Sequence, residues 1–314
     1  MNKPLQQSIL KTLAYFDTFE YPLIANEVHR WLFKPDGVYS ISAVNHELDI
    51  LKQQNKIQQQ QGFYFFDGKR SNIDKRLDAY LLVKQKMNIA KKAARIIRYI
   101  PFVQALFVCN TVAGATPSQE SDIDVLIVID DTHLWVSRFL VTLFLAFFRL
   151  RRTKNNVHNK ICLSFYITKS ASNFETIQII NNDIYLAYWV DQLIPIYDNN
   201  NYLLEIYKKN KWLHKKLPHA LTDQMIHSNW KIDQTIFSKI IKKTGEVLIM
   251  LTGGYLEKIL KKIQKKKMDK NVGSLQYKDD SRVIINDNML KFHENDRRIY
   301  FKKRWIDRCN ELGI

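Results

Sequence analysis

The spacing of hydrophobic residues along the chain alternates between the period of a helix and that of a buried strand. Apolar runs at 103–108 and 123–129, each with one polar residue (Gln104 and Asp124), predict two strands, and the run KICLSFYIT at 160–168 predicts a third. Around them, apolar residues recur every three or four positions, as they do through 71–99. The pattern therefore predicts a sheet whose strands are covered by helices.

Residues 133–152 are more apolar than the neighbouring helical segments. The segment is too short and too interrupted to predict a membrane-spanning helix. We therefore expect it to pack against the sheet, although its basic end, Arg149 to Arg152, would also suit a membrane surface.

The chain from 176 onward has mainly helical spacing, interrupted by prolines that are expected to end helices. The predicted helices are 184–190, 202–215 and 232–268. Residues 219–229 resemble a linker in composition. Residues 269–314 are polar apart from 283–285, and we expect them to dock as a tail.

The first 68 residues have a separate pattern. Apolar spacing predicts helices at 4–17 and 25–32, and Ser40 or Ser42 could cap a third that ends near Gln54. The pair Gln61-Gly62 favours a turn and therefore predicts a hairpin. This order resembles a winged-helix module.

The third of these helices would be the base-reading helix of a DNA-binding winged helix. Its polar positions are not basic, and they include two acids: Asn45, His46, Glu47, Asp49 and Lys52. This composition favours a structural or protein-contact role over DNA binding, since DNA readers usually bring Arg or Lys to the phosphates.

Composition limits the class of protein but does not identify it. The 48 Lys and Arg outnumber the 31 Asp and Glu, which gives a net charge of +17. This charge permits binding to nucleic acid, nucleotides or an anionic membrane. One lysine cluster falls at the end of the predicted helix 232–268: Lys261, Lys262, Lys265, Lys266 and Lys267.

The three cysteines, Cys109, Cys162 and Cys309, are scattered and form no disulfide framework or zinc spacing. The N-terminal residues lack the apolar core of a signal peptide. A reducing cytoplasm is therefore the expected compartment, with no transmembrane segment.

The candidate chemistry lies at the start of the second predicted strand. Asp122 and Asp124 are two residues apart, so their side chains share one face of that strand. Two neighbouring carboxylates repel each other and lose hydration there, and a hard divalent cation relieves both penalties. The polar pair Asn110-Thr111 follows the preceding strand and could contact phosphate.

The strand, the polar turn and the Ser121-Asp122-Ile123-Asp124 element resemble the nucleotidyltransferase superfamily, the fold of DNA polymerase beta and the minimal nucleotidyltransferases. The resemblance implies an α+β fold with a mixed sheet flanked by helices. It also implies Mg²⁺ (or Mn²⁺) on the catalytic Asp122 and Asp124, and an NTP substrate held by Asn110, Thr111 and Ser121. The acceptor of the nucleotidyl group stays open.

The expected domains are a winged-helix-like module at 1–68, a nucleotidyltransferase core at 69–175 and a helical C-terminal region at 176–314.

Two departures from the family pattern keep other functions open. Asn110 stands where the family has glycine, and 160–168 has no acid, with Ser164 at the position where a third carboxylate is expected. Glu175 or Asp183 could substitute from a loop. The alternatives are a catalytically degenerate nucleotidyltransferase that acts as a binding or regulatory protein, and a winged-helix DNA-binding regulator.

Overall fold

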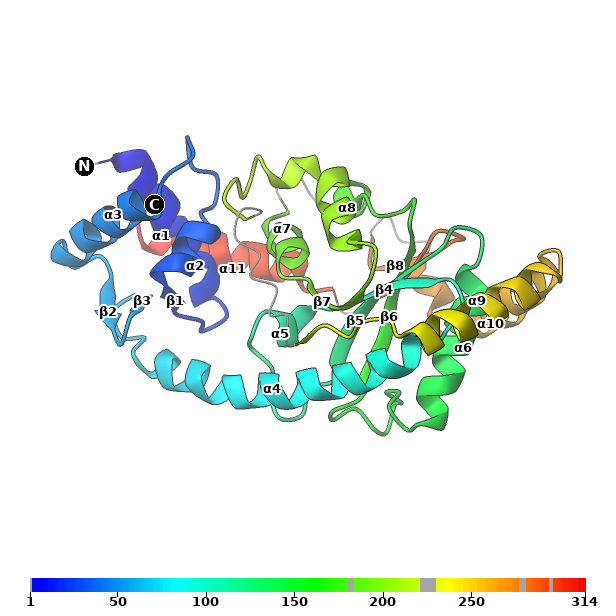
Figure 1. The fold of residues 1–314 in the computed structure, drawn as a ribbon. Coiled ribbons are helices and arrows are strands. Elements are labelled where there is room, and N and C mark those ends of the chain that lie inside the picture. The colour runs from blue at the N-terminus through cyan, green and yellow to red at the C-terminus, as the bar shows by residue number, and fades with distance from the viewer. Residues whose placement is uncertain (1, 180–182, 221–229, 277–280, 294–295) are drawn as a thin grey trace.

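A computed structural model describes residues 2–179, 183–220, 230–293 except 277–280, and 296–314, with only the backbone for 271–276. The fold is α+β, with a mixed six-stranded sheet flanked by helices (Figure 1). The strand order is β7-β4-β5-β6-β9-β8. The strands are β4 (Val103–Val108), β5 (Ile123–Ile129), β6 (Ile161–Thr168), β7 (Ile194–Asp198), β8 (Val283–Ile285) and β9 (Met289–Phe292).

The three strands predicted from apolar runs form the centre of the sheet. β4 is antiparallel to β5, and β5 is parallel to β6. The short helix α5 (Asn110–Ala113) follows β4 directly. The polar turn and the acidic start of β5 are thereby brought to the same end of the sheet.

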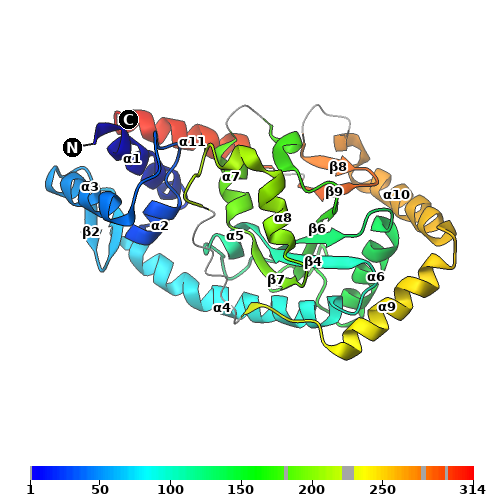
Figure 2. The ribbon, with the colours of Figure 1, turned by 45° about the horizontal axis from the view of Figure 1, so that its top comes forward.

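Helices cover both faces of this sheet (Figure 2). One face packs against α4 (Ser71–Ile97), α6 (Leu134–Phe147) and α10 (Tyr255–Gln276). The other packs against α7 (Ile184–Asp191), α8 (Tyr202–Lys209) and α1 (Lys3–Asp17). Because β5 alternates, its isoleucines at 123, 127 and 129 enter the first layer and Leu126 and Val128 enter the second.

The region after 176 differs from the prediction, because it also supplies strands β7, β8 and β9. Pro195 does not simply follow a helix but lies in β7, an edge strand, where a missing N–H is tolerated. The apolar run at 283–285 is the opposite edge strand, β8. β7 and β9 were missed because their partners β4 and β6 lie far away in the sequence, whereas β8, which pairs with the nearby β9, is only three residues long.

Two predicted helices are also divided. The segment 232–268 contains α9 (Ile236–Met250) and the start of α10, separated at Gly253 and Gly254, which both have positive φ. The segment 202–215 contains α8 and the short 3₁₀ helix Lys211–Leu213. Most of the expected linker, 221–229, lies outside the described residues.

The N-terminal module contains α1, α2 (Ala25–Arg30), α3 (Ile41–Gln53) and a small antiparallel sheet. The order of this sheet is β1-β3-β2, formed by β1 (Leu23–Ile24), β2 (Gln58–Gln60) and β3 (Phe63–Phe65). Ser40 caps α3 by accepting the backbone N–H of Ala43 at 3.2 Å. The hairpin turn is at Gln61-Gly62, as predicted.

One residue of α3 was wrongly placed on its outer face. Glu47 is buried, and it accepts hydrogen bonds from the Gln6 amide at 2.7 Å and the Asn2 backbone N–H at 2.9 Å. His46 and Asp49 are exposed, as expected. The buried acid links α3 to α1 instead of contributing to an outer binding surface.

The module shares a hydrophobic core with the layer that contains α7. Tyr15 stacks on Tyr188 with ring centroids 4.3 Å apart. Asp191, at the end of α7, accepts the Trp31 indole N–H at 2.8 Å and pairs with Arg30 at 3.1 Å. The N-terminal module is therefore docked on the sheet domain by a buried carboxylate.

Among the described residues, no helix combines the length and the apolar character needed to span a bilayer.

We expect Asp191→Ala to lower the free energy of unfolding by about 3 kcal/mol, because it leaves a buried indole N–H and the Arg30 guanidinium without their acceptor. Urea unfolding followed by tryptophan fluorescence measures this change. Asp49→Ala is the matched control, since Asp49 is exposed and lies 3.9 Å from Lys52; it should change stability by less than about 0.5 kcal/mol. Equal, small effects of both substitutions would contradict the proposed importance of this contact.

Candidate functional site

The acidic pair at the start of β5 is the centre of the site. Asp122 immediately precedes β5 and Asp124 is its second residue. Ligand atoms of Asp122, Asp124 and Cys162 all lie within 4.8 Å of one another. The two carboxylates thus share one face of the strand, and a thiol from the adjacent parallel strand completes the group.

The thiol, not Ser164, occupies the position beside Asp124. Asp124 is the register partner of Cys162, whereas Leu126 is the partner of Phe165, so β6 has one extra residue between these pairs. The extra residue breaks the expected alternation, and Leu163 and Phe165 pack on opposite faces of the sheet. Ser164 lies 3.3 Å from the His293 ring nitrogen instead.

Arg152 is the cationic partner of the acidic pair, and sequence reasoning missed this role. Its guanidinium lies 2.9 Å from Asp122 Oδ2 and donates a longer contact of 3.4 Å to Cys162 Sγ. The signal was the basic run at 149–152, which we had considered only as a possible membrane contact. Asp122 Oδ2 is buried, and the Arg152 guanidinium is its ion-pair partner.

The environment of Asp124 opposes its ionisation. Burial raises the pKa of this carboxyl above its ordinary value, and the neighbouring charge of Asp122 raises it further. The Asn110 amide, the Cys162 thiol and Arg152 act in the opposite direction and do not cancel the increase. A bound cation would remove much of this penalty.

Burial also acts on the thiol. It raises the pKa of Cys162 to about 12, and the two aspartates add to the effect. Cys162 is therefore a neutral thiol near pH 7, which is a poor ligand for a hard cation.

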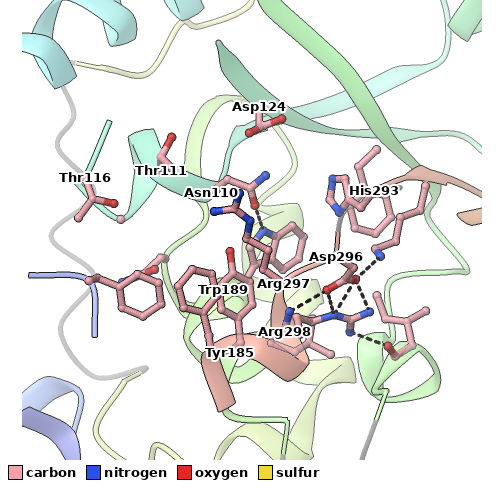
Figure 3. Close-up of a pocket in the computed structure, with 18 of the residues that line it drawn as sticks. Asn110, Thr111, Thr116, Asp124, Tyr185, Trp189, His293, Asp296, Arg297 and Arg298 are labelled. Carbon is pink, nitrogen blue, oxygen red and sulfur yellow. Dashed lines mark hydrogen bonds and ion pairs between the residues drawn. The ribbon is translucent and has the colours of Figure 1, made fainter. Parts of the chain in front are cut away.

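Asn110 and Thr111, the predicted polar turn, border a cavity of about 620 Å³ that Asp124 and Arg152 also line. Asn110 has φ of 55°, a left-handed conformation that asparagine tolerates better than most residues. Its Oδ1 accepts the Trp189 indole N–H at 2.7 Å (Figure 3). The residue that replaces glycine thus fits the turn, and its side chain is anchored by an aromatic residue of α7.

Ser121 takes a different place from the one predicted. Its hydroxyl donates to the Ser118 carbonyl at 3.0 Å, and Ser121 does not line the cavity. Thr116, which sequence reasoning did not select, does line it. Ser121 therefore stabilises the loop before Asp122, and Thr116 is the additional hydroxyl available in the cavity.

The C-terminal segment closes the other side of the cavity (Figure 3). Asp296 pairs with Lys291 at 3.1 Å and with Arg298 at 2.8 Å, and Arg298 also pairs with Asp183 at 3.1 Å. This buried network fixes the start of α11 (Arg298–Glu311). The sequence prediction of a docked tail missed that the tail lines the site.

Arg297 lies in the chain between Asp296 and Arg298, and its side chain is exposed. Its side chain extends from the start of α11 toward Asn110 (Figure 3). It makes no ion pair with another described residue, unlike Arg298 beside it. Arg297 is thus a cation that can receive an anionic ligand in the cavity.

His293 is not a proton acceptor near neutral pH. Burial lowers its pKa to about 3, and the nearby Lys291 lowers it further. Asp183, one of the loop acids considered as a substitute, caps α7 and is held by Arg298. Neither Asp183 nor Glu175 lines the cavity.

Lys86 positions the loop that carries Asp122. This lysine of α4 is fully buried, and its ammonium donates to the Ser121 carbonyl at 2.7 Å and to Asn159 Oδ1 at 2.9 Å. A lysine on the more polar side of a helix would ordinarily lie in solvent. The helix instead holds the polypeptide immediately before the acidic pair.

The residues fit one hard divalent ion. Two carboxylates are suitable ligands for Mg²⁺ or Mn²⁺, and oxygens of Asp122 and Asp124 lie within 4.8 Å of each other, close enough to share one ion. The third position is a protonated thiol, and Arg152 already offsets part of the charge. This donor set does not fit a pair of bridged ions.

Comparison of the chain with protein families, with curated proteins and with solved structures finds no match in any of the three.

We expect Asp124→Asn to stabilise the metal-free protein by on the order of 1 kcal/mol at pH 8, because it removes a buried charge that the fold disfavours. The advantage should shrink as the pH falls toward the raised pKa of Asp124, where the wild type becomes protonated and neutral. Thermal unfolding at several pH values in the presence of a chelator measures this. Asp78→Asn, an exposed acid on α4, is the control and should show no such trend; destabilisation by Asp124→Asn at every pH would contradict the assignment.

We expect Lys86→Met to cost about 2 kcal/mol in stability, because it leaves the Ser121 carbonyl and Asn159 Oδ1 without their donor. The loop before Asp122 should also become more susceptible to protease under native conditions. Lys84→Met, an exposed lysine on the same helix, is the matched control and should leave both properties unchanged. Equal protease resistance of the two variants would show that Lys86 does not hold the loop.

Proposed function

We propose that the chain is a nucleotidyltransferase-fold protein that binds an NTP with one divalent cation and transfers the nucleotidyl group to an acceptor. The observation that carries this proposal is the cavity itself. The acidic residue Asp124, the polar turn Asn110-Thr111 and the guanidinium of Arg297, which forms no ion pair with another described residue, all line it. These groups are chemically suited to a cation, to phosphate oxygens and to their negative charge, respectively.

In this proposal, Asp122 and Asp124 would hold Mg²⁺ or Mn²⁺, which supplies charge neutralisation at the phosphates when bound. Arg297 binds phosphate oxygens from the opposite wall, and the hydroxyls of Thr111 and Thr116 donate to them. Trp189 orients the Asn110 amide through its indole N–H. Catalysis then depends mainly on position and electrostatics.

The acceptor proton has few available bases. Among the described residues, the carboxylates that line the cavity are Asp124 and Asp296, and Asp296 is already bound by Lys291 and Arg298. Asp124 is thus the group that would take the proton, directly or through water. Because the same carboxylate would hold the cation, we expect slow turnover compared with an enzyme that has a separate base.

A catalytically degenerate binding protein is the second candidate. It is favoured by the presence of a thiol, Cys162, and not a third carboxylate, beside Asp124, and by the Arg152–Asp122 ion pair. Such a protein would bind nucleotide in the same cavity without transfer. Duplex DNA binding by the winged-helix-like module has less support, because the exposed face of α3 carries Asp49 beside a single lysine, Lys52.

We expect calorimetry to show binding of at least one NTP that requires Mg²⁺ or Mn²⁺. Asp122→Ala and Arg297→Ala should each weaken it about tenfold or more, because each removes a charge-assisted contact. Asp78→Ala should leave it unchanged. Absence of cation-dependent binding with every NTP would refute both candidates.

Transfer distinguishes the two candidates. The wild type incubated with α-labelled NTP and Mn²⁺ should label itself or an added acceptor, and Asp124→Asn should not. Retention of NTP binding with no labelling in extracts or purified mixtures would favour the binding protein.

A further inference from the structure

Helix α9 presents an exposed apolar face, which we call the α9 stripe: Ile236, Phe237, Ile240, Ile241, Val247, Leu248 and Leu251. These residues recur at spacings of three, four and seven, so they lie on one side of the helix. Phe237 is 65 % exposed, Leu248 60 % and Leu251 78 %. A contiguous apolar surface of this kind usually marks an interaction site.

The opposite, polar side of α9 contacts the body of the protein. Ser238 and Lys242 are buried, and the Lys242 ammonium donates to the Val103 carbonyl. Glu246 accepts the Phe102 backbone N–H at 3.2 Å. Gly245 lies so close to Pro101 that an added Cβ would be 2.6 Å from its ring. The helix is therefore held with its polar side inward, which leaves the stripe exposed apart from an edge contact of Phe237 with Tyr99, whose ring centroids lie 6.2 Å apart.

Helix α10 places positive charge next to this apolar surface. Its inner side is fixed by Glu257, which accepts the backbone N–H groups of Trp135 and Val136, and by Gln264. Its outer side combines the exposed apolar residues Tyr255, Ile259 and Ile263 with lysines: Lys258, Lys262, Lys266 and Lys270. Residues 236–270 contain ten lysines and three acids, a net charge of +7.

The turn between α9 and α10 forms one extremity of the molecule, at the end opposite the N-terminal module (Figures 1 and 2). Helix α6, which packs against α10, lies at the same end and exposes Phe139, Leu143 and Phe147. Arg149 and Arg151 follow it in the chain. Helices α6, α9 and α10 thus give this end of the molecule both exposed apolar side chains and cationic side chains.

We propose that the α9–α10 end docks on the surface of an anionic lipid bilayer, with the α9 stripe in the boundary between headgroups and acyl chains. Lysine beside exposed apolar and aromatic residues is the combination that such a surface binds. A symmetric contact with a second copy would bring two patches of the same positive charge together. Nucleic acid would satisfy the lysines but would leave the stripe in water.

Flotation of the full chain with lipid vesicles tests this proposal. The protein should bind vesicles that contain about 30 % phosphatidylglycerol and should bind pure phosphatidylcholine at least tenfold more weakly. Leu248→Asp/Leu251→Asp should lower binding to anionic vesicles by more than tenfold, and Lys262→Gln/Lys266→Gln by about tenfold. Binding should fall between about 0.1 M and about 0.5 M NaCl, because the electrostatic part is screened.

The matched controls are Leu81→Asp, at an exposed leucine of α4, and Lys84→Gln/Lys92→Gln on the same helix; both should bind like wild type. All substituted residues are exposed, and unchanged thermal unfolding confirms folding. Equal affinity for neutral and anionic vesicles, or no binding to either, overturns the proposal. A concentration-dependent dimer that Leu248→Asp/Leu251→Asp abolishes, without vesicle binding, would assign the stripe to a second copy.

Discussion

The repulsion between two neighbouring carboxylates is the constraint on which the site depends. Asp122 and Asp124 share one face at the start of a buried strand, where water offers little relief. The protein supplies partial compensation from Arg152 and holds the preceding loop through the buried ammonium of Lys86. The arrangement stores an unfavourable interaction that a cation can relieve, which is why it indicates binding rather than stability alone.

The acidic pair and the central strands could be predicted because they depend on local sequence. A continuous apolar run predicts a buried strand, and period-two geometry then places both aspartates on one face. The hairpin at Gln61-Gly62 and the Ser40 cap follow from equally local preferences. For these elements the short-range pattern and the tertiary structure agree.

The remaining parts of the site depend on pairing between distant segments. Because β6 has an extra residue, Cys162 and not Ser164 lies beside Asp124. The periodic pattern of the sequence does not reveal this extra residue. Arg297 reaches the cavity only because β9 pairs with β6 and a buried ion network fixes α11. Helix α9 has a clear apolar face, yet contacts with Pro101 and Phe102 turn that face outward. The amphipathic pattern of a helix identifies its apolar face but does not say whether that face is directed to the core or to the surface.

The pairing of β9 with β6 has a consequence for the order of events during synthesis. The chain leaves the ribosome from its N-terminus, so Asp124 and the open edge of β6 emerge well before residues 289–298. Until β9 arrives, that edge has unpaired backbone groups and the cavity lacks its far wall. A nascent chain shorter than this segment therefore exposes an aggregation-prone strand and an incomplete pocket, and the ligand binding that we propose would require the late strand to have closed the sheet.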